Sequence, residues 1–318
     1  MSDGTVERVA NAILYEGYLL YPYRASALKN QRRWNFGVVY PRSSDRGCVD
    51  PWAMQTECLC QAGPLSSIQI KVRFLRLGEQ TNTEASPSYL QYAEDSEILL
   101  PVRRLVELMA SPLTREFSFE GGVERRGPIN RRRRHLQGIV TARATETKEG
   151  PWKITVRIEN RTPPALDHLY PSGPDEILLQ SLVSTHTILR LRDGDFVSMI
   201  DPPEELRKAA SCCANLGTWP VLVGEEGKRD TVLSAPIILY DYPQIAPESP
   251  GDLFDGTEID EILTLRILTM TDEEKEEVRR TDPRARQLLE RTEALPAEDF
   301  MRLHGVLRAA VSTGGSNT

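Results

Sequence analysis

The sequence contains no uninterrupted run of about 18 apolar residues, the length that a membrane-spanning helix needs. The N-terminus also lacks a basic stretch, and Glu16 and Gly17 interrupt its apolar segment, which a secretory signal would keep continuous. We therefore expect a cytoplasmic chain that keeps its N-terminus and is not inserted into a membrane.

Cysteine and histidine are scarce, with five and four residues among 318. An odd number of cysteines in a long chain argues against a disulfide framework and for reduced thiols. No G-x-S-x-G, Walker, H-E-x-x-H or dinucleotide-binding motif occurs, so we expect no catalysis of its own. His186, in an apolar segment, fits a hydrogen-bonded core residue better than a ligand. A hydrolase would need His168 or His186 in an open cleft beside Cys or Ser.

The charge balance is acidic, since 39 Lys and Arg stand against 46 Asp and Glu, which leaves a formal net charge of −7. This balance excludes a globally basic nucleic-acid-binding protein. Hydrophobic residues make up 40% of the chain, enough to build a core in a globular protein of one or two domains.

Alternating apolar and polar residues predict β-strands in the first half of the chain. The clearest is 68–77, where Ile68, Ile70, Val72 and Phe74 share one face. Alternation indicates a sheet with one solvated face, which favours antiparallel pairing. Three further strands are predicted from aromatic and β-branched residues: 18–23, 34–40 and 54–60.

A β-hairpin is predicted from 136–146 and 152–160, joined by the turn residues 148–151. The polar residues 78–97 predict a long loop, whereas 98–110 fits either a strand or a short helix. A short amphipathic helix is predicted at 5–14.

In the second half, Asp193-Gly194 predicts a turn between the buried segment 176–191 and a partner strand at 196–200. The prolines of 243–256 predict a rigid loop. Before that loop, one helix and two strands are predicted: 204–214, 219–224 and 231–242.

From Thr257 the apolar spacing becomes helical, with Thr257 as the N-cap residue. The expected fold is α+β, with a predominantly antiparallel, sandwich-like β core and a C-terminal helical segment. Four prolines in 161–175 predict an irregular connection between two lobes. The expected divisions are a β-rich lobe, a second β-rich lobe with one helix, the helical segment and a disordered tail: 1–160, 176–256, 257–311 and 312–318.

The cysteines suggest a possible metal site. Cys58 and Cys60 are separated by one residue, so a strand would place both thiols on one face, close enough to share a soft metal. Cys212 and Cys213 are adjacent on a predicted helix, so their side chains diverge and only one of them suits a mixed site. This alternative describes a metal-handling protein or metalloenzyme that holds Zn, Ni or Fe. The competing interpretation is buried, apolar cysteines without any cofactor, because no Cys-x-x-Cys pair accompanies them.

Two charged runs also have two interpretations. The acidic residues between Asp252 and Glu261 offer oxygen ligands for Ca²⁺ or Mg²⁺, but their spacing is not that of an EF-hand, and a capped helix N-terminus explains them. Arg131 to Arg134, preceded by Arg125 and Arg126, suits a phosphate backbone or an acidic protein patch. In an acidic chain, a solvated loop that pairs with local carboxylates or with a protein partner is favoured over nucleic-acid binding.

Residues 15–42 combine aromatic and basic side chains, the types enriched in binding hot spots. The alternative is a hairpin whose aromatic side chains fill the core. Because one face can be buried while the other is presented, we predict partner-binding residues here: Tyr21, Tyr23, Arg24, Arg32, Arg33 and Trp34.

Several motifs together resemble a bacterial protein family encoded in the gene clusters of uptake NiFe hydrogenases. They are LYEGYLLYPYR (14–24), Lys29-Asn30, Trp34, Phe36-Gly37, MQTEC (54–58), PIILYDYP (236–243), APESP (246–250) and FDGTEIDEILTLR (254–266). The resemblance implies an accessory, assembly or maturation role, with a hydrogenase subunit or its precursor as the partner. It provides no catalytic residues.

Overall fold

The computed structural model describes residues 3–15, 36–42, 51–82, 90–148, 150–163 and 174–244, together with Lys275 and Glu290. The predicted C-terminal helical segment and tail therefore lie outside the described residues, apart from these two positions. The predicted strand at 18–23 lies outside them as well. The strand predicted at 34–40 is wrong where it can be compared, because residues 36–40 form no strand beyond an isolated bridge between Val39 and Leu182.

One strand, β1 (Ala53–Asn82), organises the molecule. Its first part pairs with β8 (Trp152–Asn160) and its middle with β9 (Val183–Phe196). Its last part pairs with β2 (Leu90–Leu99) and β6 (Ile129–Arg133), and a short contact is made with β3 (Arg103–Arg104). The strands predicted at 54–60 and 68–77 are thus parts of a single strand that has different partners along its length.

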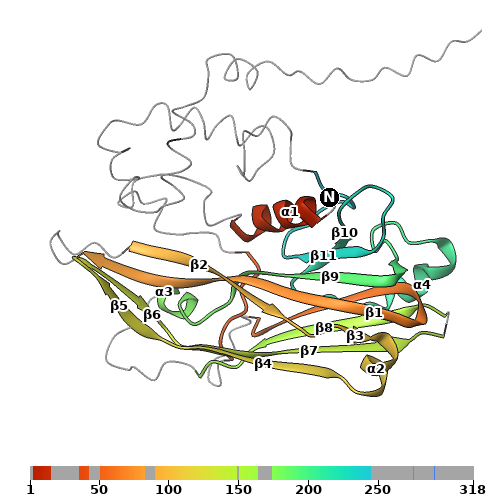
Figure 1. Ribbon diagram of the computed structural model, residues 1–318, viewed down its shortest axis with the longest axis horizontal. Coiled ribbons are helices and arrows are strands. Elements are labelled where there is room, and N and C mark those ends of the chain that lie inside the picture. Colours follow the sequence, from red (N-terminus) through yellow and green to blue (C-terminus); the bar gives the residue numbers. More distant parts are fainter. Residues whose placement is uncertain are drawn as a thin grey trace, which may run out of the picture.

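The sheet folds into two facing layers (Figure 1). Its strand order is β10-β11-β9-β1-β8-β7-β4, and all the pairings are antiparallel. The predicted α+β fold with a predominantly antiparallel β core is confirmed. The strands not yet bounded are β4 (Leu113–Phe119), β5 (Gly122–Arg126), β7 (Leu136–Glu146), β10 (Trp219–Leu222) and β11 (Thr231–Ala235).

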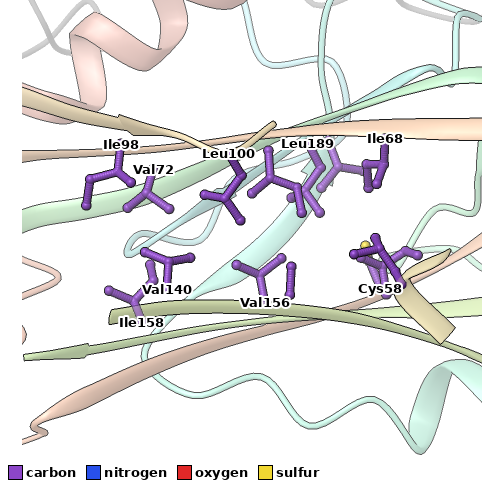
Figure 2. Packing of buried hydrophobic residues seen from close by; sticks show 14 of the residues in the cluster. Cys58, Ile68, Val72, Ile98, Leu100, Val140, Val156, Ile158 and Leu189 are labelled. Carbon is purple, nitrogen blue, oxygen red and sulfur yellow. The ribbon is translucent and has the colours of Figure 1, made fainter. Parts of the chain in front are cut away.

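Apolar side chains from the two layers meet in one core (Figure 2). Ile68, Val72 and Leu189 lie in one layer and face Val140 and Val156 in the other. All five are at most 4% exposed, and burying each such side chain contributes about 1.5–3 kcal/mol. The period-2 alternation seen in the sequence therefore marks the inward faces of both layers.

Short helices complete the described part. Helix α1 (Asp3–Tyr15) confirms the helix predicted at 5–14, and α2 (Leu105–Ala110) buries Leu105 and Leu108 in the core. The helix predicted at 204–214 is present in two shorter pieces, η1 and α4. The bounds of the remaining helices are α3 (Pro174–Leu178), η1 (Glu204–Leu206) and α4 (Arg207–Ser211). None of the described helices has the length and apolar character needed to cross a bilayer.

The prediction of a long loop at 78–97 is wrong for both ends of this range, because both ends form strands. Residues 78–82 continue β1, and 90–97 belong to β2. The polar composition misled the prediction because β2 places charged residues opposite basic residues of β1: Glu94 pairs in register with Arg76, and Glu97 with Arg73. Cross-strand pairs of opposite charge can stabilise a solvent-exposed strand even when its sequence shows no alternation of apolar residues.

The turn predicted at Asp193-Gly194 is also wrong, because β9 runs through it without reversing. Asp193 does have a positive φ of 60°, and the register with β1 shifts between Ala62 and Ser67. Asp193 and Gly194 therefore continue β9 opposite a β-bulge in β1. Residues 197–200 do not form the predicted partner strand. Since β9 lies between β1 and β11, strands from both expected lobes belong to one sheet.

Gly138 allows β4, β7 and β8 to approach closely. A Cβ at this position would lie 2.4 Å from the Glu159 carbonyl oxygen and 2.4 Å from Cζ of Phe117. We expect Gly138→Ala to lower the free energy of unfolding by about 1–3 kcal/mol, because the neighbouring backbone must shift. Gly122→Ala is the matched control, since no atom lies within 4 Å of its Cβ position, and should change stability by less than about 0.5 kcal/mol. Equal effects in urea denaturation would contradict the close approach.

Candidate interaction surface

Helix α1 covers the outer face of β9 and β11 and fixes the point from which the aromatic and basic segment departs (Figure 1). The Glu7 carboxylate accepts hydrogen bonds from Lys71 Nζ at 3.0 Å and from Arg73 Nη1 at 3.3 Å. The chain leaves the described region after Tyr15. The apolar side of the helix packs against side chains of β9, β10 and β11 through Val6, Val9, Ala10 and Ile13.

The chain returns at residues 36–42, beside the start of β9. The backbone N–H groups of Ser184 and Thr185 donate to the carbonyl oxygens of Phe36 and Gly37, at 2.9 and 3.0 Å. Gly37 has a φ of +54°, and a Cβ there would lie 2.6 Å from Cβ of Pro236. Only glycine fits such a position without strain. The end of the aromatic and basic segment therefore lies directly against the start of segment 236–242.

Segment 236–242 runs beside the edge strand β10 and is tied to both of its ends. It begins directly after β11, whose last residue pairs with Trp219. At the other end, Tyr242 N–H donates to the Leu222 carbonyl oxygen at 2.7 Å, and Leu222 N–H donates to the Asp241 carboxylate at 2.8 Å. These bonds hold an irregular segment in a defined place without a regular strand.

Side chains of this segment alternate between inside and outside. Ile237 and Leu239 pack against the cluster beneath α1, whereas Ile238 is 77% and Tyr240 84% exposed. Trp219 is 44% exposed at the start of β10. We call Trp219, Ile238 and Tyr240 the edge patch. The strand predicted at 231–242 ends at Ala235, so the sequence did not predict this patch. The run of bulky residues 237–240, with no polar alternation, is the signal that could have indicated it.

Beneath this surface, β9 carries buried polar side chains at 184–187. His186 is fully buried, and its Nδ1 lies 2.9 Å from the Ser184 carbonyl oxygen, whereas its Nε2 has no hydrogen-bond partner among the described residues. Burial, with a smaller contribution from Arg73, lowers the pKa of His186 to about 4, although the hydrogen bond with the Ser184 carbonyl oxygen and the charge of Glu7 oppose the shift. His186 is thus the hydrogen-bonded core residue that was predicted. It does not lie in the open cleft that a hydrolase would need, and His168 lies outside the described residues.

The structure separates the four candidate metal-binding thiols. Cys58 and Cys60 lie in the core between the layers, where burial raises the pKa of Cys58 well above its ordinary value and that of Cys60 to about 12. Cys213 instead packs with Leu59, which points to the opposite face of β1, and Cys212 is exposed. Burial raises the pKa of Cys213 to about 11. Within the described residues, no group of three or more His, Cys, Asp or Glu side chains could hold a metal ion.

The arginine run is not the predicted loop. Arg131 to Arg133 belong to β6, which forms a hairpin with β5 and pairs with the end of β1. The predicted pairing with local carboxylates is confirmed, because Arg133 lies 3.0 Å from Glu94 and Arg132 lies 3.6 Å from Glu79. The carboxylates that pair with these arginines belong to neighbouring strands and are distant from them in the sequence.

Other predicted residues lie outside the described part of the chain. They are the acidic group 252–261, most of the loop 243–256 and all six predicted partner-binding residues: Tyr21, Tyr23, Arg24, Arg32, Arg33 and Trp34. At the described end of the aromatic and basic segment, the Arg42 guanidinium lies 4.6 Å from the ring centre of Trp52. Arg157 approaches the same ring at 5.3 Å, so Trp52 makes two cation–π contacts.

Stability should depend on His186 between pH 6.5 and about 4. Above pH 6.5 the imidazole is neutral in both the folded and unfolded states; at lower pH the unfolded state gains the proton first, because the folded pKa is about 4. As the pH falls through this window, the wild type should lose about 3 kcal/mol more stability than His186→Gln. Urea denaturation at several pH values measures this. His135→Gln, at a half-buried histidine outside the core, is the control and should keep the wild-type slope, whereas equal slopes for wild type and His186→Gln would contradict the burial.

Thiol alkylation should follow burial. In the folded protein at pH 8, iodoacetamide should label Cys212 first, because it is exposed, and Cys213 more slowly, because its pKa is raised to about 11. Cys58 and Cys60 should react only after denaturation. Peptide mass mapping assigns each site, and rapid labelling of Cys58 or Cys60 in the folded state would contradict their placement in the core.

No family model matches this chain, and no curated protein sequence matches it. Its function is therefore inferred from the surface formed by α1, residues 36–42 and segment 236–242, and from the sequence resemblance.

Proposed function

We propose that this chain is a non-catalytic accessory protein that binds a NiFe hydrogenase subunit, or the precursor of that subunit, during assembly or maturation. The observation that carries the proposal is the edge patch, in which Ile238 and Tyr240 are exposed although the segment that bears them is held in place. Exposed bulky side chains on a fixed support are typical of a binding surface.

The edge patch has the physical properties of a recognition surface. Tyr and Trp present large, stiff contact areas, and both types are enriched among residues that dominate binding energy. The hydrogen bonds at Asp241 and Tyr242 fix the backbone before a partner arrives. Binding then loses less conformational entropy than it would with a free loop.

The surface also unites segments that are far apart in the sequence. Gly37 touches Pro236, so the predicted partner-binding segment ends where the edge patch segment begins. A partner that contacts residues 36–42 is positioned to contact the edge patch segment as well.

The choice of partner rests on the resemblance. The motif PIILYDYP at 236–243 is among the residues that carry it, and the same residues form the segment with the edge patch. Phe36-Gly37, a second part of the resemblance, holds the neighbouring contact with β9. Two of the motifs that carry the resemblance, Phe36-Gly37 and PIILYDYP, therefore coincide with the proposed binding surface, whereas MQTEC (54–58) lies on β1.

Co-purification with tagged hydrogenase large or small subunit tests the proposal. The full chain should be enriched over an unrelated bait in cells that express the hydrogenase. The double variant Ile238→Ser and Tyr240→Ser should lower affinity at least about tenfold, because it removes exposed anchors without disturbing the core.

Leu65→Ser with Leu99→Ser is the matched control. Both residues are exposed, at 75% and 48%, and lie on β1 and β2, outside the edge patch. This control should bind like the wild type. No enrichment of the wild-type chain, or equal loss in both double variants, would contradict the proposal.

A further inference from the structure

The hairpin of β5 and β6 forms an arm at the end of the sheet away from α4 (Figure 1). Its turn contains Gly127, with a φ of +58°, followed by Pro128. β6 pairs with residues 78–82 of β1, and β5 pairs only with β6 among the described strands. The arm therefore has one side attached to the sheet and, within the part of the chain that the structure describes, one strand edge without a pairing strand.

On one face of the arm, the arginine side chains have partners within the protein. Arg131 donates to Gln80 at 2.9 Å and lies 5.0 Å from the ring centre of Tyr92. Arg133 pairs with Glu94 at 3.0 Å and with Glu124 at 3.3 Å. The guanidinium groups of Arg131 and Arg133 on this face therefore interact with neighbouring side chains of the same chain.

The opposite face carries hydrogen-bond donors around a hollow of about 210 Å³. Strand alternation and the register place Thr81, Asn130 and Arg125 in one row across the three strands, and Glu79, Arg132 and Val123 in the next. All six line the hollow. Arg132 has a single ion pair, with Glu79 at 3.6 Å, and Arg125 has no ion-pair partner within the described residues.

The geometry points to a binding site for the carboxylates of an acidic, extended peptide segment. Arg125 and Arg132 supply guanidinium forks, which match carboxylate geometry. Asn130 and Thr81 add neutral donors, and Val123, which is 60% exposed, adds an apolar contact beside them. The unpaired edge of β5 offers backbone groups to an added strand, whose alternate side chains would reach the hollow.

The charges favour a peptide over a nucleic acid. Glu79 lines the hollow, and its carboxylate would repel a continuous row of phosphates. An acidic side chain of a peptide can instead lie next to Arg125 and away from Glu79. The apolar contact at Val123 suits an alternating acidic and aliphatic segment. This site is distinct from the edge patch, so a negative hydrogenase experiment leaves it untouched.

Fluorescence anisotropy with the full chain tests the site. The probe is a labelled hexapeptide of alternating Glu and Val. Two other labelled probes are compared with it: the same peptide with Gln in place of Glu, and a single-stranded oligonucleotide. Inorganic phosphate is added as a competitor of the Glu peptide. The Glu peptide should bind, and binding should weaken as salt is raised. The Gln peptide, phosphate and oligonucleotide should bind at least tenfold more weakly.

Three variants localise the binding. Arg125→Gln should weaken it about tenfold, because a charged hydrogen bond is lost. Glu79→Gln should strengthen it several-fold, since repulsion is removed and Arg132 is released. Arg143→Gln, an exposed arginine on β7, is the matched control and should have no effect.

Four outcomes overturn the proposal. They are absence of peptide binding at 1 mM, wild-type affinity in Arg125→Gln, weaker binding in Glu79→Gln, and equal or tighter binding of phosphate, the neutral peptide or the oligonucleotide. Circular dichroism of each variant confirms that the fold is retained, and the gain expected for Glu79→Gln cannot arise from unfolding.

Discussion

The structure depends on one strand that serves two layers. β1 pairs with β8 in one layer and with β2 and β9 in the other, so its apolar residues must face inward in both. The bulge between Ala62 and Ser67 allows this change, because the extra residues bend the strand without breaking it. The core, the position of α1 and the attachment of the β5–β6 arm all follow from this continuous strand.

Both proposed binding surfaces lie where the sheet has an edge. An edge strand has unpaired backbone groups, and natural sheets limit uncontrolled pairing there. At β10, Pro220 lacks an N–H, and Asp241 and Tyr242 occupy the groups of Leu222. The protein therefore presents side chains at β10, whereas at β5 it leaves a short backbone edge beside a basic hollow.

Local patterns predicted the elements whose neighbours are close in sequence. The hairpin of β7 and β8, helix α1 and the strands β10 and β11 were found because alternation or helical spacing repeats over several residues. The strands β2, β5 and β6 were missed because their charged residues pair across strands, which resembles loop composition. Similarly, Asp193-Gly194 carries the same residues whether it forms a turn or lies within a strand, and only pairing with β1, which carries the bulge between Ala62 and Ser67, selects the strand.

The sequence by itself determined that this is an acidic, antiparallel β-rich chain and that His186 is a core residue, since composition and periodicity are local properties. Tertiary structure decided that Cys58 and Cys60 face the core while Cys213 lies on the other side of β1. It also decided that Gly37 meets Pro236 and that Arg125 and Arg132 share a hollow with Glu79. These contacts join residues distant in the chain, and their geometry is set by strand register, which a single sequence does not encode locally.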